Sequence, residues 1–141
     1  MICRCLHEGE AFECAGNLYS MLIPRDETRC LEAALETVAP GQSTPPNAHE
    51  SFVQLLVMFS GKARVHIGSE SREVPAPAVA FIPRRASHFV ESVGQGPLQY
   101  MYVSIWPGPM PPEEDRPWHE VCVRMITEYA ERGFPPRRDQ E

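Results

Sequence analysis

Between residues 18 and 105 the chain alternates short hydrophobic runs with short stretches of turn-forming residues. The runs are rich in Val, Ile, Leu, Phe and Tyr, whereas Gly, Pro, Asn, Asp and Ser lie between them. Runs of this length and spacing are typical of an antiparallel β-sandwich or barrel. We predict strands at residues 18–23, 31–38, 52–59, 63–67, 78–82, 88–92 and 98–105.

The run at residues 31–38, Leu-Glu-Ala-Ala-Leu-Glu-Thr-Val, fits more than one element. Its residues also have good helix propensity, but its neighbours are strands, and Pro40 and Gly41 follow it directly. We therefore predict a strand here, with a helix as the alternative.

The run at residues 52–59 is apolar at almost every position. In a strand that faces water on one side, polar and apolar residues should alternate. Both faces must therefore be covered, and one of them would carry Val53, Leu55, Val57 and Phe59. Exposed, these four residues would form an aggregation-prone patch, so we predict a homodimer that buries them. Alternatively, the N-terminal strand or the C-terminal helix of the same chain covers this face.

The composition changes after Ile105. Residues 106–112 are rich in Pro and predict an extended connector. Apolar residues then recur with helical spacing, and Gly133 suits the end of a helix. These apolar residues are Trp118, Val121, Cys122, Met125, Ile126 and Tyr129.

We therefore divide the chain in two. Residues 1–107 are predicted to form a β-barrel, with its core at residues 31–107, and residues 108–141 to form the connector, the helix and a mobile tail. We expect the helix to pack on the outside of the barrel or on a neighbouring subunit. A lid over a pocket is the alternative.

The composition narrows the functional classes. Nineteen acidic residues against 13 Lys and Arg give a formal net charge of −6, which disfavours a nucleic-acid partner. No apolar run approaches the ~20 residues that span a bilayer, and the N-terminus does not resemble a signal peptide. Five irregularly spaced cysteines do not suggest a disulfide framework. We expect a soluble cytoplasmic protein with reduced thiols and no membrane partner.

Two spaced motifs carry the candidate chemistry. The first reads Gly41-x5-Asn47-x-His49-x4-Gln54-x6-Gly61, and the second reads Pro83-x-Arg85-x2-His88. Their spacing resembles the two motifs of the cupin superfamily, and the resemblance extends over residues 31–107. It implies an all-β fold, the double-stranded β-helix or jelly-roll barrel of small RmlC-like cupins, here followed by a C-terminal α-helix.

The resemblance also implies a divalent transition metal at the motif residues. His49 and His88 stand at two ligand positions, whereas Asn47 replaces a His and Gln54 replaces a Glu. Because side chains alternate along an extended chain, Asn47 and His49 would point the same way. Imidazoles inside a barrel suit Zn, Fe, Ni, Cu or Mn. We predict His49 and His88 as the main ligands, Gln54 as the next and Asn47 as the weakest.

The two amide residues weaken this ligand set. Two imidazoles and two amides would leave the full charge of a divalent ion in a site of low dielectric. An anionic substrate or hydroxide would have to supply the missing charge. The alternative is a hydrogen-bonded polar cluster of Asn47, His49, Gln54 and His88 at the pocket floor. Glu50 is not a substitute ligand, because its neighbour His49 would face the opposite way.

Strand alternation also predicts part of a pocket lining. If Gln54 points inward, Leu56 and Met58 follow it, and if His88 points inward, Val90 follows it. An apolar cavity with a few polar groups at its floor is typical of a small-molecule site.

The last strand and the second motif add further candidates. Either Tyr100 and Tyr102 or Met101 and Val103 face the interior, and the sequence does not fix which. Arg85 could pair with a substrate carboxylate, although an arginine before a strand more often lies in a solvated turn.

Together these features predict a small metal-dependent enzyme that acts on a small organic molecule, anionic or aromatic. The resemblance implies oxygenase, lyase, isomerase or cyclase chemistry without selecting among them. The alternative is a non-catalytic module that binds a small molecule or metal. It is slightly favoured by the lack of an obvious general base near the motifs.

Overall fold

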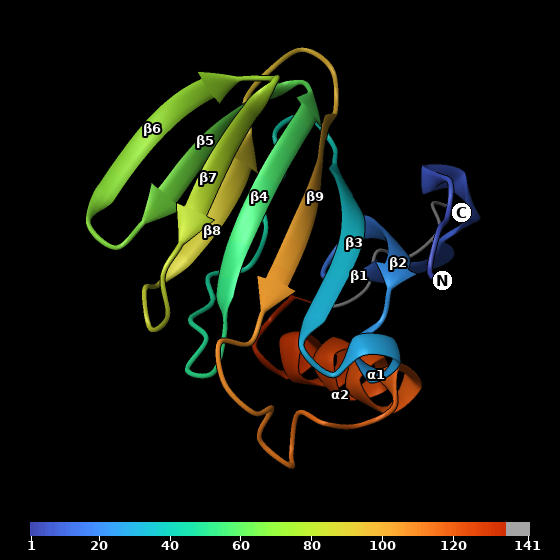
Figure 1. Ribbon diagram of the computed structural model, residues 1–141. Coiled ribbons are helices and arrows are strands. Elements are labelled where there is room, and N and C mark those ends of the chain that lie inside the picture. The colour runs from blue at the N-terminus through green and yellow to red at the C-terminus, as the bar shows by residue number, and fades with distance from the viewer. Residues whose placement is uncertain (135–141) are drawn as a thin grey trace.

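Two antiparallel β-sheets face each other in the computed structural model, which describes residues 1–134 (Figure 1). The predicted mobile tail falls at residues 135–141, outside the described residues. The elements in chain order are a 3-10 turn (Leu6–Glu8), β1 (Glu10–Cys14), β2 (Asn17–Ile23), α1 (Arg25–Thr28), β3 (Leu31–Val38), β4 (Val53–Ser60), β5 (Lys62–Ile67), β6 (Glu70–Pro75), β7 (Ala78–Ile82), β8 (His88–Ser92), β9 (Leu98–Ile105) and α2 (Trp118–Glu131).

The larger sheet has the strand order β1-β2-β3-β9-β4-β7, and the smaller has the order β6-β5-β8. Neighbouring strands are antiparallel throughout. The long loop between β3 and β4 adds isolated bridges to the smaller sheet, from Ser43 to Glu91 and from Asn47 to His88. This confirms the predicted all-β fold with a helix near the C-terminus.

The ambiguous run at residues 31–38 is a strand, β3, paired with β2 and β9 over its length. All seven predicted strands are present, but β1, β6 and α1 were not expected. β6 lies at a sheet edge and is largely exposed, so its sequence carries charges rather than an apolar run. Such charged edges discourage pairing with other chains.

The turn between β4 and β5 requires glycine. Gly61 has φ +88°, and a Cβ there would lie 2.6 Å from the Pro97 carbonyl oxygen. Glycine alone tolerates both the left-handed backbone and this close approach. The last glycine of the first motif therefore fixes a corner of the barrel.

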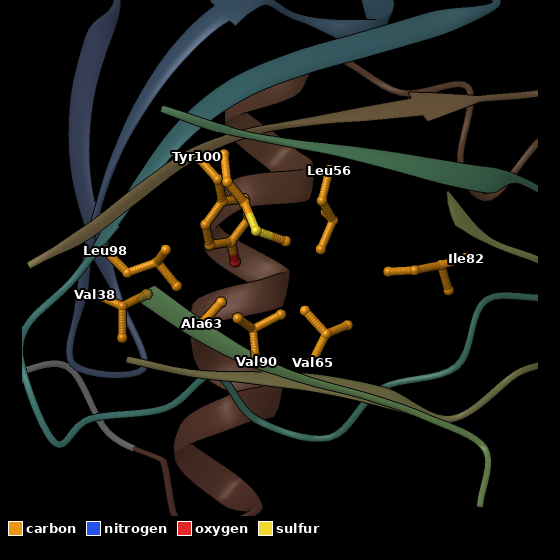
Figure 2. Close-up of a cluster of buried hydrophobic side chains, with 9 residues drawn as sticks. Val38, Leu56, Ala63, Val65, Ile82, Val90, Leu98 and Tyr100 are labelled. Carbon is orange, nitrogen blue, oxygen red and sulfur yellow. The ribbon is translucent and has the colours of Figure 1, made fainter. Parts of the chain in front are cut away.

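An apolar cluster fills one end of the space between the sheets. Figure 2 shows side chains from both sheets pointing toward one another there. The sheets thus supply a close-packed core. The cluster consists of Val38, Leu56, Met58, Ala63, Val65, Ile82, Val90, Leu98 and Tyr100.

Helix α2 lies beside the opposite end of the barrel (Figure 1). Its buried residues Trp118 and Val121 pack with Met21 and Ala34 of the larger sheet. Within residues 1–134, no helix combines the length and apolar character needed to cross a membrane.

Candidate functional site

A cavity of about 390 Å³ opens between the two sheets at the polar end of the barrel. Strands β2, β3, β4, β8 and β9, the loop before β4 and helix α2 all contribute to its walls. A volume of this size suits a small organic molecule. All four tyrosines of the protein line it: Tyr19, Tyr100, Tyr102 and Tyr129.

Two histidines meet in this cavity. His49 lies in the loop before β4, four residues ahead of Val53, and His88 begins β8; their ring centroids are 5.1 Å apart. Two backbone hydrogen bonds hold the segments that carry these histidines together. Asn47 N–H donates to the His88 carbonyl at 3.0 Å, and His88 N–H donates to the Asn47 carbonyl at 2.8 Å. The two motifs, about forty residues apart in sequence, therefore converge as their spacing predicts.

The hydrogen bond of His88 shows which of its two ring nitrogens is free to bind a ligand. Its Nδ1 lies 3.0 Å from the carbonyl oxygen of Ala86. A carbonyl only accepts, so Nδ1 donates and the lone pair of a neutral ring resides on Nε2. His49 stacks on Phe52, with ring centroids 4.3 Å apart.

Burial keeps both imidazoles neutral at physiological pH. It lowers the pKa of His49 to about 3; a proton on the neighbouring His88 and the charge of Arg25 act in the same direction. Burial also lowers the pKa of His88, although the Ala86 carbonyl opposes this change. Neutral imidazoles are the form that binds transition metals.

The two amides at the other motif positions are already engaged. Gln54 donates from Nε2 to Ser104 Oγ at 3.0 Å, which leaves its carbonyl oxygen unused by this contact. Asn47 donates to the Tyr129 hydroxyl and accepts a 3.4 Å contact from Arg132. Asn47 thus ties the motif loop to α2, as well as standing at a ligand position. Across residues 1–134, no group of three or more His, Cys, Asp or Glu side chains is placed to hold a metal ion.

The predicted pocket residues separate into those at the cavity and those away from it. Leu56, Val90, Tyr100 and Tyr102 line it, so the open question about β9 is resolved in favour of the tyrosines.

Met58 and Arg85 do not line the cavity, which corrects their predicted placement. Met58 points inward, but it lies two residues after Leu56 on β4, within the apolar cluster and away from the cavity. The guanidinium of Arg85 pairs with Glu50 at 3.0 Å, and its side chain is 73% exposed. The residue occupies a turn with φ +70°, which directs this arginine to solvent rather than to the cavity.

Two buried glutamates of β3 line the cavity and were missed by the sequence analysis. Glu32 forms a bidentate ion pair with Arg25, at 2.7 and 3.2 Å. Glu36 instead accepts a hydrogen bond of 2.5 Å from the Tyr100 hydroxyl. Strand alternation would have placed both on one face, but charged residues in strands usually face water.

Helix α2 packs against the larger sheet and also walls the cavity with several side chains. They are Val121, Arg124, Met125, Glu128 and Tyr129, followed by Arg132 after the helix. Tyr129 and Arg132 also bond to the motif loop, at Asn47 and the Pro46 carbonyl.

Comparison with known proteins identifies the family. The model of the cupin domain matches residues 34–106, more than half of the chain. The chain belongs to the cupin family. No curated protein matches the sequence significantly.

Several solved structures share the fold at low sequence identity. A predicted oxalate decarboxylase from Thermotoga maritima superposes with a TM-score of 0.67 and 20% identity, over 75% of this chain and 99% of that one. The Schizosaccharomyces pombe Cnp3 cupin domain gives 0.67 and 13%, over 94% and 81%. KdgF from Halomonas sp. gives 0.61 and 18%, over 76% and 92%. These similarities establish the fold and leave the activity to be argued from the site.

Proposed function

We propose that this cupin is a metal-dependent enzyme that acts on a small, oxygen-bearing organic molecule, anionic or aromatic. The observation that supports it best is the pair of neutral imidazoles, 5.1 Å apart, in a cavity of about 390 Å³. His49 and His88 would be the protein ligands of the ion. Zn, Fe, Ni, Cu and Mn remain the candidate metals.

The residues present fit a metal with two firm protein ligands. The rings are close enough for one ion to contact a nitrogen of each, and Gln54 has a carbonyl oxygen to add. No carboxylate joins them, but five glutamates and three arginines line the cavity, so its walls carry an excess of acidic groups. Because Arg25 neutralises Glu32 and burial raises the pKa of Glu36 to about 7, oxygens of the substrate would have to offset most of the charge of the ion.

The remaining residues suggest how a substrate would be held. A bound divalent ion would polarise a carbonyl or carboxylate oxygen. The aromatic faces of Tyr19, Tyr100 and Tyr102 offer apolar contact, and their hydroxyls offer hydrogen bonds. Helix α2 places the apolar side chains of Val121 and Met125 in the cavity wall, where they would limit the access of water.

Calorimetric titration with Zn²⁺ tests the metal assignment. We expect stoichiometric binding by the wild type, and its loss in His49→Ala and in His88→Ala. Asn47→Ala should only weaken binding, whereas Gln54→Glu should tighten it by restoring an anionic ligand. His66→Ala is the matched control, because this histidine pairs with Glu91 and does not line the cavity. Unchanged binding in both cavity variants would contradict the assignment.

A non-catalytic binding module is the second candidate. It is favoured by Asn47 and Gln54, which replace stronger ligands and leave the ion without an anionic protein ligand. Mass spectrometry of small molecules released from the purified protein, followed by incubation with the same molecules, separates the two. If a released molecule is unchanged after prolonged incubation with the protein, the binding module is favoured. If the protein converts the molecule to a product, the enzyme is favoured.

We also propose that a second copy of the chain covers the outer face of the larger sheet. Leu55 and Val57 of β4 pair there with Phe81 and Val79 of β7. Val79 is 68% exposed and Phe81 is 59% exposed, so neither helix α2 nor the N-terminal strands cover them. An apolar face of this kind supports a homodimer.

The cytoplasmic location is likewise a proposal. All five cysteines are free in the structure, and three of them are exposed. Free, exposed thiols are typical of proteins in reducing compartments.

A further inference from the structure

Helix α2 is attached to the barrel in two different ways along its length. Near its start, Trp118 and Val121 are 4% and 6% exposed and pack on the larger sheet. Among its described residues, none from Cys122 to Glu131 is buried, although Met125, Glu128 and Tyr129 still line the cavity. The first turn is therefore the firm attachment, because burial of apolar surface is the main stabilising contribution to such packing.

The later turns of α2 are attached to the loop between β3 and β4 by polar contacts. Within residues 1–134, three hydrogen bonds join this loop to the helix and the residue after it. The Tyr129 hydroxyl accepts from Asn47 Nδ2, and the Arg132 guanidinium donates to Asn47 Oδ1 at 3.4 Å and to the Pro46 carbonyl. Each such bond adds little net stability, so these turns detach more easily than the first turn.

Both polar atoms of the Asn47 side chain are used in these contacts. An arginine only donates, so the atom that faces Arg132 is the amide oxygen, and the amide nitrogen faces Tyr129. The oxygen is the atom through which an amide binds a metal ion, and a guanidinium beside it disfavours a second cation there. The side chain at this motif position therefore binds α2 in preference to an ion.

The contact between the loop and the helix lies at the wall of the cavity. Asn47 and Ala48 line the cavity from the loop, and Met125 and Tyr129 line it from α2. The bond between Asn47 and Tyr129 joins these two parts of the wall. Separation of the helix from the loop would therefore open a side passage beside His49, which follows Asn47 by two residues.

We propose that the part of α2 after Val121 is a gate over the cavity, and that Asn47 holds this gate closed. The proposal rests on the function proposed above for the contents of the cavity, and it adds how that site is reached. Asn47, which the motif predicts as the weakest metal ligand, then acts on the ion through the gate. The weaker Zn²⁺ binding expected for Asn47→Ala follows from loss of the closed state.

Amide hydrogen exchange of the metal-free protein tests whether Asn47 holds the helix. Asn47→Ala leaves the sequence of α2 unchanged, and Tyr129→Phe leaves the loop unchanged, yet both remove the same bond. Detached helix turns lose their structure, because short helices are marginal in water. We expect each variant to raise exchange at residues 125–131 about fivefold, as loss of one hydrogen bond would, with β3 unaffected. The double variant should exceed Asn47→Ala little.

The rates of Zn²⁺ uptake and release test whether the helix controls access. Uptake is followed by stopped flow with a fluorescent zinc indicator, and release is followed after addition of excess EDTA. A gate limits both rates, so Tyr129→Phe should raise each about fivefold and change the dissociation constant less than threefold. Thr127→Val is the matched control, because it removes a hydroxyl that bonds only within α2, to the Val123 carbonyl, and should change neither rate.

Four other outcomes bear on the gate and on the metal site separately. Unchanged amide exchange in both variants overturns the gate, whether or not Zn²⁺ binds. Raised exchange with unchanged Zn²⁺ rates also overturns it, because the helix then moves without controlling access. If Asn47→Ala speeds release alone and Tyr129→Phe changes neither rate, Asn47 is a ligand and its role in the gate is overturned. If the wild type binds no Zn²⁺, the proposed function fails, whereas raised exchange in both variants still supports the role of Asn47.

Discussion

The two ends of the barrel interior are built by the same strands from opposite kinds of residue. Along β4 the inward positions change from Gln54 to Leu56 and Met58, and along β9 from Ser104 and Tyr102 to Leu98. One end is the apolar cluster of Figure 2, and the other is the cavity. A single alternation of side chains therefore produces both a core and a site.

The difference between the apolar and the polar end indicates which end stabilises the fold. Burial of the apolar cluster is favourable in itself, whereas the histidines and glutamates of the cavity lose hydration when buried. If the polar end served only the fold, apolar residues of similar size would serve it better. The polar residues are thus best explained by what they bind.

The largest expected effect is at the apolar end. Met58 is 1% exposed within the cluster, so Met58→Ala should lower the free energy of unfolding by about 2–5 kcal/mol, measured by urea denaturation. Val123→Ala, on the exposed face of α2, is the control and should cost far less. A loss below about 1 kcal/mol for Met58→Ala would mean that this end is not the stabilising core.

At the polar end, Glu36 should make stability depend on pH. Its pKa rises from 4.5 to about 7 on folding. The stability it contributes is therefore complete below pH 4.5 and is lost as the pH rises through about 7. The gap between these values corresponds to about 3 kcal/mol. The difference in unfolding free energy between the wild type and Glu36→Gln should change by this order between acidic and alkaline buffers; a constant difference would contradict the buried, uncharged carboxyl.

Loss of one cavity histidine should affect stability less. We expect the metal-free His88→Ala protein to unfold within about 2 kcal/mol of the wild type at neutral pH, because the ring carries one backbone hydrogen bond and no charge. Thermal unfolding measures this difference. A much larger loss without metal would show that the histidine pair holds the fold together.

The smallest effect on the folded protomer should come from its outer face. Val57→Glu places a charge among the apolar side chains of β4, so we expect it to convert a dimer to a monomer that remains folded. Sedimentation velocity at micromolar concentration measures this change, and Ser71→Glu on the exposed strand β6 is the control. A monomeric wild-type protein would contradict the proposal that a second copy of the chain covers this face.

The sequence predicted the fold because periodicity and motif spacing act locally. The strands of the motif region, the inward face of β4 and the start of α2 near Trp118 all agree with the structure. The convergence of His49 and His88 also followed from the motif spacing, although His49 lies within the loop before β4 and only His88 begins a strand.

The missed features depend on contacts that no local pattern encodes. In the sequence, Glu36 has the character of a solvent-exposed strand residue, and only its contacts with β2, β9 and α2 make it buried. Asn47 stands at a ligand position, yet its bonds to Tyr129 and Arg132 come from residues more than eighty positions away. The exposed edge β6 lacked the apolar run by which strands are recognised.

X-ray absorption at the zinc edge of the full-length, zinc-loaded protein tests the central claim that the polar end is a metal-dependent site. The account predicts the signature of two imidazole ligands, completed by oxygen, and its disappearance in the double variant His49→Ala/His88→Ala. Sulfur ligands, for which Cys3, Cys5 and Cys30 are the exposed candidates, or a spectrum unchanged in the double variant would contradict it.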